Sequence, residues 1–217
     1  MQLYGFFRSS TSYRLRIALA LKGLDYQAHY VNLPKDEQRG EGYLSVNPHG
    51  LVPTLVDGGH TLTQSLALLD YLEETHPEPP ILPADPAGRA HVRALAQVIG
   101  CEIRPLNNLR VLKYLKGTLG LDQAAHDRWY CHWVTEGLAN YETSLQALEA
   151  QGLRGGRYSY GSDVTIADIC LVPQIFNAYR FHCPLDGFPR TMAVFEACMA
   201  LPAFDETQPK KQPDAVA

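Results

Sequence analysis

The chain has 217 residues, of which 46% are hydrophobic and 19% are charged, and its formal net charge is -4 at pH 7. This is the composition of an ordinary globular protein, long enough for one large domain or two small ones. The small negative charge argues against a nucleic-acid partner and against an anionic membrane surface. No basic segment followed by an apolar run opens the chain, and no apolar stretch is long enough to span a bilayer. We therefore expect a cytoplasmic protein without a membrane or nucleic-acid partner.

The first residues predict a strand that turns into a helix at a cluster of hydroxyl groups. Apolar residues at about 2–7 are typical of a short strand, and the pattern over about 12–22 indicates a helix. The junction contains Arg8, Ser9, Ser10 and Thr11. Ser and Thr oxygens cap the unpaired N–H groups of a first helical turn, whose partial positive charge also stabilises an anion. Capping accounts for only one of the three hydroxyls. The junction is therefore either an ordinary helix cap or, because of the other two hydroxyls and Arg8, an anion-binding site.

The next part of the chain predicts a second strand, a hairpin and a second helix. Residues at about 26–32 indicate the strand, and two apolar runs flank Asp57-Gly58-Gly59, which suits a tight turn with positive φ. A helix then opens at Gln64-Ser65, with apolar residues at helical spacing. The order βαβ followed by ββα predicts a compact mixed sheet with helices packed against it.

Proline marks a change of architecture after residue 76. Five prolines between residues 77 and 86 exclude regular structure there and predict a linker. Beyond it the pattern is helical, and the apolar and aromatic stripe from Trp129 to Leu148 is interpreted as core. The polar tail after Phe204 is expected to be loosely ordered. We place an α/β domain at residues 1–80, a linker at 81–87 and an all-helical domain at 88–217.

The cysteines and histidines indicate no metal site. The five cysteines are odd in number and contain no CxxC pair, and the eight histidines form no HExxH or His/Cys cluster. We therefore expect neither a disulfide framework nor a zinc site, and interpret the cysteines as buried reduced thiols. Thr165 with Asp168 three residues later is typical of a capping box, so Asp168 is assigned a structural role.

Several motifs are specific when they are taken together. The residues from Ser9 to Leu19 read Ser-Ser-Thr-Ser-Tyr-Arg-Leu-Arg-Ile-Ala-Leu, and Asn47-Pro48 precedes Val52-Pro53 and Gln64-Ser65. Further motifs are Asn107–Leu112, Asp168–Gln174, Asn177–Phe181 and Gln212–Asp214. Together with the domain order, these motifs resemble the zeta class of the glutathione transferases over essentially the whole chain.

The resemblance implies a fold, a cofactor and an assembly. It implies an N-terminal thioredoxin-like domain followed by a C-terminal helical bundle, glutathione as the cofactor, and a homodimer. Pro53 is implied to be cis, with the backbone of Val52 pairing with the cysteine of glutathione. Gln64 and Ser65 are implied to hold the γ-glutamyl end, because a carboxylate suits a helix N-terminus.

The resemblance also implies the glutathione-dependent cis–trans isomerisation of maleylacetoacetate to fumarylacetoacetate. A thiolate that adds to the cis double bond leaves a single bond that can rotate, and its expulsion gives the trans product. The catalytic candidates are Ser9, Ser10, Thr11 and Arg8, and the three hydroxyl residues are expected to keep the sulfur ionised. Thr11 stands where the class pattern has a cysteine, so the nucleophile is expected to come from glutathione. The arginines suit two carboxylates. The substrate-binding candidates are Arg8 and Arg180 first, and then Arg104, Asn108 and Arg110.

Three alternatives stay open at this point. Maleylpyruvate shares the cis-enone and both carboxylates and differs by one methylene, which is worth about 1–3 kcal/mol in a pocket. A glutathione-dependent dehalogenase, peroxidase or conjugating transferase needs the same thiolate but no pair of carboxylate-binding arginines. A non-catalytic binding module needs no thiolate site. Arg8 and Arg180 favour the isomerase, although each arginine also fits a solvated surface cation.

Overall fold

The computed structural model describes residues 1–215, and the chain divides into two compact units. The first unit contains residues 1–81 and the segment that begins at Ala200, and the second contains residues 82–199. The division after Ile81 falls inside the proline-rich stretch. The last segment differs from the predicted division, because it belongs to the first unit and not to the helical domain at 88–217.

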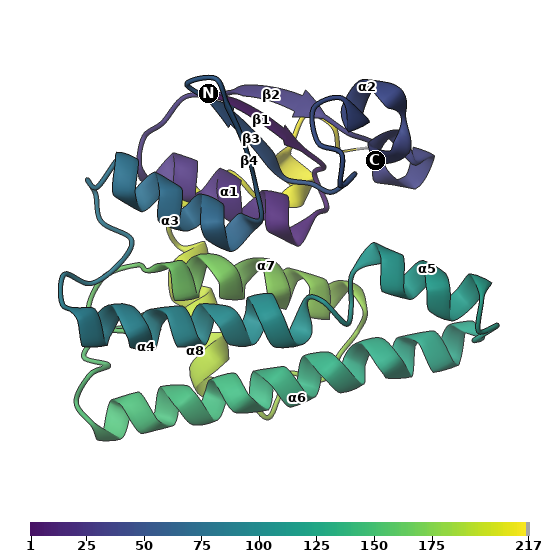
Figure 1. Cartoon of the computed structure of the whole chain (residues 1–217). Helices are drawn as coiled ribbons and strands as arrows, with labels where there is room; N and C mark the ends of the chain where they lie inside the picture. Colours follow the sequence, from purple (N-terminus) through teal and green to yellow (C-terminus); the bar gives the residue numbers. More distant parts are fainter. Residues whose placement is uncertain (216–217) are drawn as a thin grey trace. The chain divides into compact units, whose positions relative to one another are not determined.

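The first unit is built on a four-stranded mixed sheet with the strand order β2-β1-β3-β4 (Figure 1). β1 and β2 are parallel and joined by a helix, and the antiparallel hairpin of β3 and β4 continues the sheet from β1. This confirms the predicted order βαβ followed by ββα. The elements are β1 (Gln2–Gly5), α1 (Ser10–Leu21), β2 (Gln27–Tyr30), η1 (Leu33–Lys35), η2 (Glu37–Arg39), α2 (Glu41–Leu44), β3 (Thr54–Asp57), β4 (His60–Thr63), α3 (Ser65–Thr75), α9 (Pro202–Asp205) and η4 (Pro209–Lys211).

The core of this unit lies between the sheet and the helices α1 and α3. The two helices pack against each other on the same side of the sheet (Figure 1). Nearly all of α1 is buried, and Leu15, Ile17 and Leu19 are 0% exposed, as are Leu55 of β3 and Leu69 of α3. Burial of these side chains supplies the main stabilisation of the unit. The predicted site residues at the starts of α1 and α3 therefore lie on helices that are fixed by this core.

Residues 204–215 are held by three hydrogen bonds to earlier residues of the first unit. The Tyr13 hydroxyl donates to the Phe204 carbonyl at 2.8 Å, and Arg16 Nε donates to the Thr207 carbonyl at 3.0 Å. The Asp214 carboxylate accepts from a backbone N–H near the end of β1. For residues 205–215 the prediction of a loosely ordered tail is wrong, because their polar groups bond to partners that are distant in sequence; residues 216–217 lie outside the described part of the chain.

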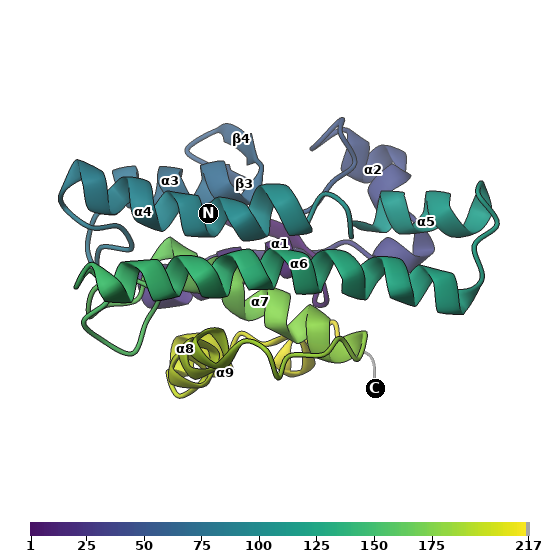
Figure 2. The same ribbon diagram turned by 90° about the horizontal axis from the view of Figure 1, so that it is seen from below.

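The second unit is helical, and α7 lies at its centre. α7 packs against α4 and α8, and α6 packs against α8 and η3 (Figure 2). The stripe predicted as core is confirmed for Val134, Leu138, Tyr141 and Leu145, which are 0% exposed. The elements are α4 (Pro86–Gln97), the π-helical η3 (Val98–Ile103), α5 (Leu109–Gly117), α6 (Gln123–Ala150), α7 (Ile166–Arg180) and α8 (Pro189–Met199).

The predicted capping box begins α7. The N–H and the hydroxyl of Thr165 donate to Asp168 Oδ2 at 2.8 and 2.9 Å, and the N–H of Ser159 donates to Oδ1 at 2.9 Å. Asp168 is fully buried, and burial raises its pKa against these hydrogen bonds. All three donors belong to the chain itself, which fits the structural role assigned to Asp168.

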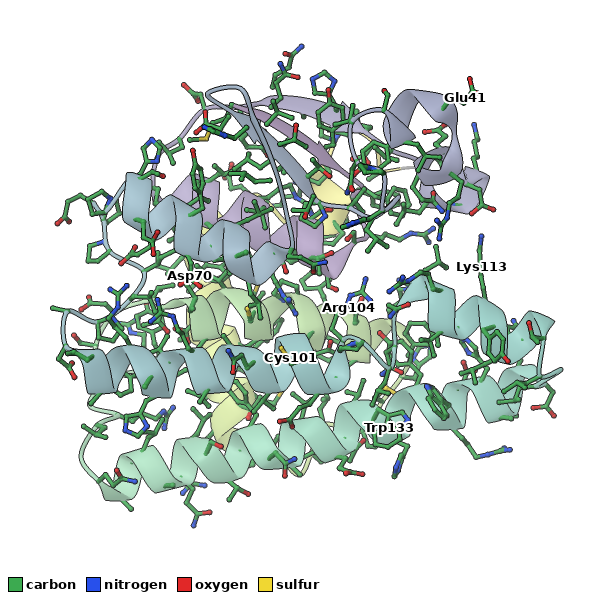
Figure 3. The ribbon with its side chains drawn as sticks, in the orientation of Figure 1. Glu41, Asp70, Cys101, Arg104, Lys113 and Trp133 are labelled. Carbon is green, nitrogen blue, oxygen red and sulfur yellow. A yellow bond between two sulfur atoms is a disulfide. The ribbon has the colours of Figure 1, made fainter. Side chains whose placement is uncertain are left out.

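The cysteines differ in part from the expectation of buried reduced thiols. Cys170 and Cys198 are buried and free, but Cys101 is exposed on η3 (Figure 3), and Cys131 of α6 forms a disulfide with Cys183. The two bonded cysteines are 52 residues apart, and the stacking of Phe181 on Tyr130 places the segment after α7 beside α6. Within residues 1–215, no helix is long and apolar enough to cross a membrane.

Candidate functional site

Ser9 caps α1, which accounts for one of the three hydroxyls. Its backbone is extended, with φ -68° and ψ 118°, and its Oγ accepts the N–H of Ser12 at 3.3 Å. The Ser9 carbonyl accepts the N–H of Tyr13 at 2.9 Å. Two of the first four N–H groups of the helix are therefore bonded within the chain, as expected for an N-cap.

The hydroxyls of Ser9 and Thr11 form a directed chain that ends on Val52. Thr11 Oγ1 lies 3.1 Å from the Val52 carbonyl oxygen and 2.9 Å from Ser9 Oγ. A carbonyl only accepts, so Thr11 donates its hydrogen to Val52, and Ser9 is the donor between the two hydroxyls. In this arrangement neither hydroxyl hydrogen remains for a ligand. The Thr11 hydroxyl must turn away from Val52 before it can donate elsewhere.

The groups that remain at the start of α1 are suited to an anion. Within residues 1–215, no partner is found for the N–H groups of Ser10 and Thr11 or for the Ser10 hydroxyl. Arg8 is exposed, and its guanidinium lies 5.6 and 5.1 Å from the ring centres of Phe6 and Phe7. Two open N–H groups, a helix dipole and a cation held by two rings favour a negative charge here.

The loop that contains Val52 is held by hydrogen bonds from an asparagine and a tyrosine. The Asn47 amide donates to the Leu51 carbonyl at 2.8 Å and to Thr54 Oγ1 at 3.0 Å, and Asn47 is 1% exposed. The Tyr43 hydroxyl donates to the same Leu51 carbonyl at 2.6 Å. The Val52–Pro53 peptide bond is cis, as the resemblance implied. The Val52 N–H has no partner in the described part of the chain, so this backbone edge can pair with a peptide.

The start of α3 is a second place where an anion is favoured. Gln64 has a positive φ of 70°, and no side chain caps the helix. Ser65 Oγ accepts a hydrogen bond of 3.1 Å from Arg14 Nη1. Arg14 is 1% exposed, and its Nε and Nη2 have no hydrogen-bond partner in residues 1–215. Arg14 was not among the predicted site residues, although an arginine amid the apolar residues of a buried helix was a visible signal.

In the second unit, two of the candidate arginines act on one buried tyrosine. Burial raises the pKa of Tyr130 to about 12, and the charges of Arg104 and Arg180 oppose that rise. The ring of Phe181 stacks on Tyr130 with 3.6 Å between centroids, and the Arg180 guanidinium lies 4.8 Å from the Phe181 centroid. Arg104 and Arg180 therefore belong to one positively charged region, although 76 positions separate them in sequence.

The other two candidates of this unit are placed differently. Asn108 is the N-cap of α5, and its Oδ1 accepts the N–H groups of Arg110 and Val111 at 2.9 and 3.1 Å. Its amide also donates to the Pro105 carbonyl at 2.6 Å. These bonds give Asn108 a capping role, and its assignment to the substrate stays a prediction. Arg110 lies exposed on α5, whereas Arg104 directly follows the π-helical segment (Figure 3).

Comparisons with known proteins agree with this architecture. The family model of the glutathione S-transferase N-terminal domain matches residues 8–75, and that of the C-terminal domain matches residues 134–202. The maleylacetoacetate isomerase of Pseudomonas aeruginosa is 46% identical, with full coverage of both chains. A solved holo structure of a maleylpyruvate isomerase, described as a bacterial zeta-class glutathione S-transferase, matches with a TM-score of 0.95, 46% identity and full coverage of both. The chain belongs to the zeta class of the glutathione transferases.

A second solved relative contains ligands. It is the maleylacetoacetate isomerase of Methylobacterium extorquens AM1 with bound malonate and glutathione, at 37% identity, a TM-score of 0.94 and full coverage of both chains. In the present chain, the order of strands and helices is the one implied by the motifs from Ser9 to Asp214. Its thioredoxin-like domain and its helical unit are therefore both confirmed.

Proposed function

We propose that this transferase is a glutathione-dependent cis–trans isomerase that converts maleylacetoacetate to fumarylacetoacetate. One observation carries the proposal: end-to-end similarity to such isomerases coincides with open anion-binding groups at the start of α1. A relative of 46% identity suggests the reaction, and the open N–H groups of Ser10 and Thr11 supply a place for a thiolate.

The groups of the first unit fit glutathione at three points. The start of α1 suits a thiolate, because its open N–H groups and its dipole favour negative charge. The backbone of Val52 suits a peptide, since its N–H is open beside the hydrogen-bonded carbonyl. The start of α3 suits a carboxylate, because it has no side-chain cap and Arg14 lies behind Ser65. These three points match a thiol, a peptide and a charged end.

The chain's own residues divide the chemistry between them. When bound, glutathione supplies a thiolate nucleophile that adds reversibly to the cis double bond and so allows rotation. Ser10, Thr11 and the start of α1 lower the pKa of that sulfur by stabilising its charge. Arg8 in the first unit and Arg104 and Arg180 in the second are the groups we assign to the substrate's carboxylates, which guanidinium groups bind in a bidentate way.

Maleylpyruvate is the second candidate substrate. The similarity to the solved maleylpyruvate isomerase, at a TM-score of 0.95, favours it. The two substrates differ by one methylene, so we expect the preference between them to be about 10- to 200-fold at most. Both candidates require the same carboxylate-binding arginines.

The deciding experiment supplies each substrate with and without glutathione. Loss of the ultraviolet absorbance of the cis substrate is followed for both compounds at matched concentrations. We expect rapid loss only with glutathione, and a higher kcat/KM for one substrate. Turnover without glutathione would exclude the proposed cofactor, and inertness toward both substrates would exclude the isomerase.

We further propose a cytoplasmic homodimer. The zeta-class resemblance supports the dimer, and the composition of the chain supports a cytoplasmic location. Light scattering on the purified protein should give about twice the monomer mass of 24.1 kDa. A mass equal to that of the monomer at micromolar concentration would refute the dimer, and recovery of the native protein outside the cytoplasm would refute the location.

A further inference from the structure

We propose that Arg14 is a positioning residue for glutathione, which acts through the Ser65 hydroxyl on the carboxylate of the γ-glutamyl end. Arg14 lies in the second turn of α1 and is 1% exposed, and the Ser65 hydroxyl is its hydrogen-bond partner. Its Nη1 donates to Ser65 Oγ at 3.1 Å. The inference rests on the proposed function only in taking glutathione as the ligand.

The direction of this hydrogen bond determines what the Ser65 hydroxyl can do. A guanidinium group only donates, so Ser65 Oγ is the acceptor and its own hydrogen is left for another partner. No acceptor for that hydrogen is found within residues 1–215. A hydroxyl that accepts from a cation is polarised and becomes a better donor to an anion. Arg14 thus turns Ser65 into a donor aimed at a carboxylate.

The position of Ser65 directs that donor toward an open helix start. Ser65 is the first residue of α3, and Gln64 before it has a φ of 70° and makes no capping hydrogen bond. The first turn of α3 contains no acidic residue. The N–H groups and dipole of this eleven-residue helix therefore favour an anion at the same point as the Ser65 hydroxyl.

The burial of Arg14 explains why a charged ligand group is the partner. Nε and Nη2 have no hydrogen-bond partner in the described residues, so only Nη1 of the buried guanidinium is hydrogen-bonded. A buried charge of this kind is costly, and its field is weakly screened. A carboxylate on the far side of Ser65 supplies the missing opposite charge. The burial cost of Arg14 is then recovered when the ligand binds.

The test compares glutathione with an analogue that lacks only the γ-glutamyl carboxylate, γ-aminobutyryl-cysteinyl-glycine. Calorimetry on the full chain measures both dissociation constants for wild type, Arg14→Met and the control Arg128→Met, an exposed arginine of α6. We expect Arg14→Met to weaken glutathione about 10- to 100-fold, as for the loss of a charge-assisted hydrogen bond. The same substitution should weaken binding of the analogue only a few-fold, and Arg128→Met should leave both dissociation constants unchanged. Equal weakening of both ligands, or of neither, would overturn the assignment.

Ser65→Ala removes the same link from the other side. Ser65→Ala alone should weaken the binding of glutathione more than the binding of the analogue. In the double variant, Arg14→Met should not increase this difference between the two ligands any further. If Arg14→Met still acts selectively there, Arg14 does not work through Ser65. Should Arg14→Met fail to fold by circular dichroism, Ser65→Ala decides: selective loss supports the proposal, and equal loss of both ligands refutes it.

Turnover at saturating glutathione separates this inference from the proposed function. If the wild type discriminates between the two ligands through Arg14 but isomerises neither substrate, the isomerase proposal is refuted and the role of Arg14 is supported. If the wild type isomerises maleylacetoacetate but Arg14→Met does not change the preference for glutathione over the analogue, the isomerase proposal is supported and the role of Arg14 is refuted.

Discussion

The Asp214 carboxylate accepts a hydrogen bond of 2.9 Å from the backbone N–H of Phe7, 207 positions earlier in the chain. Arg16 Nη2 donates to the carbonyl of the same residue at 3.0 Å. Both backbone polar groups of Phe7 are thus held by charged side chains. Because Phe7 directly precedes Arg8 and the Ser9 cap, Asp214 and Arg16 fix the loop that leads into the candidate site.

Asp214→Ala should destabilise the first unit by about 1–3 kcal/mol, because it leaves the Phe7 N–H without its acceptor. Burial lowers the pKa of Arg16 to about 10, and Asp214 acts against that shift, so the substitution also removes a favourable charge. Urea unfolding measures the loss. The exposed Asp186→Ala serves as the control, and equal stability of the two variants would contradict a role for Asp214.

Ser9→Ala with Thr11→Ala should reduce turnover about 100-fold, because the Thr11 hydroxyl can turn from the Val52 carbonyl to the sulfur and its loss removes a donor to the charge. The glutathione dissociation constant should change only a few-fold, because the peptide and its carboxylates are held elsewhere. Loss of the hydroxyls raises the pKa of the bound thiol, so the activity profile should move to higher pH.

Thr11→Val separates the hydroxyl from the shape of the side chain. It keeps the β-branch but removes the donor to the Val52 carbonyl, and should account for most of the loss. Thiolate absorbance of bound glutathione against pH provides the direct measurement. Normal turnover in the double variant would show that these hydroxyls do not support a thiolate.

Arg180→Ala should raise the KM of the isomerase substrate about 10- to 100-fold and change kcat less, because it removes a carboxylate partner. Arg104→Ala should act in the same direction, since both arginines belong to the charged region around Tyr130. Steady-state kinetics at saturating glutathione tests this, with the exposed Arg157→Ala as the control. An unchanged KM in Arg180→Ala would exclude the assigned role.

Glu142 of α6 binds the start of α8, and its contribution should depend on pH. Its Oε2 accepts the N–H and the hydroxyl of Thr191, both at 2.8 Å, and Oε1 accepts the Arg190 N–H at 3.0 Å. Burial raises the pKa of Glu142, but these hydrogen bonds outweigh it and the net pKa is lowered. A carboxyl of this kind stabilises the fold above its unfolded pKa and loses that contribution as the pH falls through its folded value.

Glu142→Gln should therefore cost about 1–3 kcal/mol at pH 7, and the gap to wild type should narrow as the pH falls below 4.5. Urea unfolding at pH 7 and in acid measures the gap, with the exposed Glu196→Gln as the control. A gap that stays constant over this pH range would contradict the prediction.

Thiol titration without reductant should detect three thiols in the unfolded chain and only Cys101 rapidly in the folded chain. Replacing Cys131 and Cys183 together by serine should lower stability by about 2–4 kcal/mol, as for loss of a cross-link over 52 residues. Cys101→Ser should leave stability unchanged. Five titratable thiols in the oxidised protein would refute the disulfide.

Local patterns were sufficient for the fold and for the outline of the site. The Asp57-Gly58-Gly59 turn, the Ser9 cap and the capping box at Thr165 all form as predicted, because each depends on neighbours within a few positions. The motif from Ser9 to Leu19 also located the start of α1, where open N–H groups are found. Glycine conformation, capping and hydrophobic periodicity are local properties, so the amino-acid sequence alone carries them.

Only the tertiary structure decided which distant side chains meet. The sequence could not show that Arg14 bonds Ser65, that Asp214 reaches Phe7, or that Cys131 bonds Cys183. The sequence predicted a loosely ordered tail, and the hydrogen bonds of residues 204–215 contradict this. By itself the sequence determined the two-part architecture and the hydroxyl-rich helix start. Where buried charges find partners depends on desolvation and close packing between segments, and these arise only when the chain has folded.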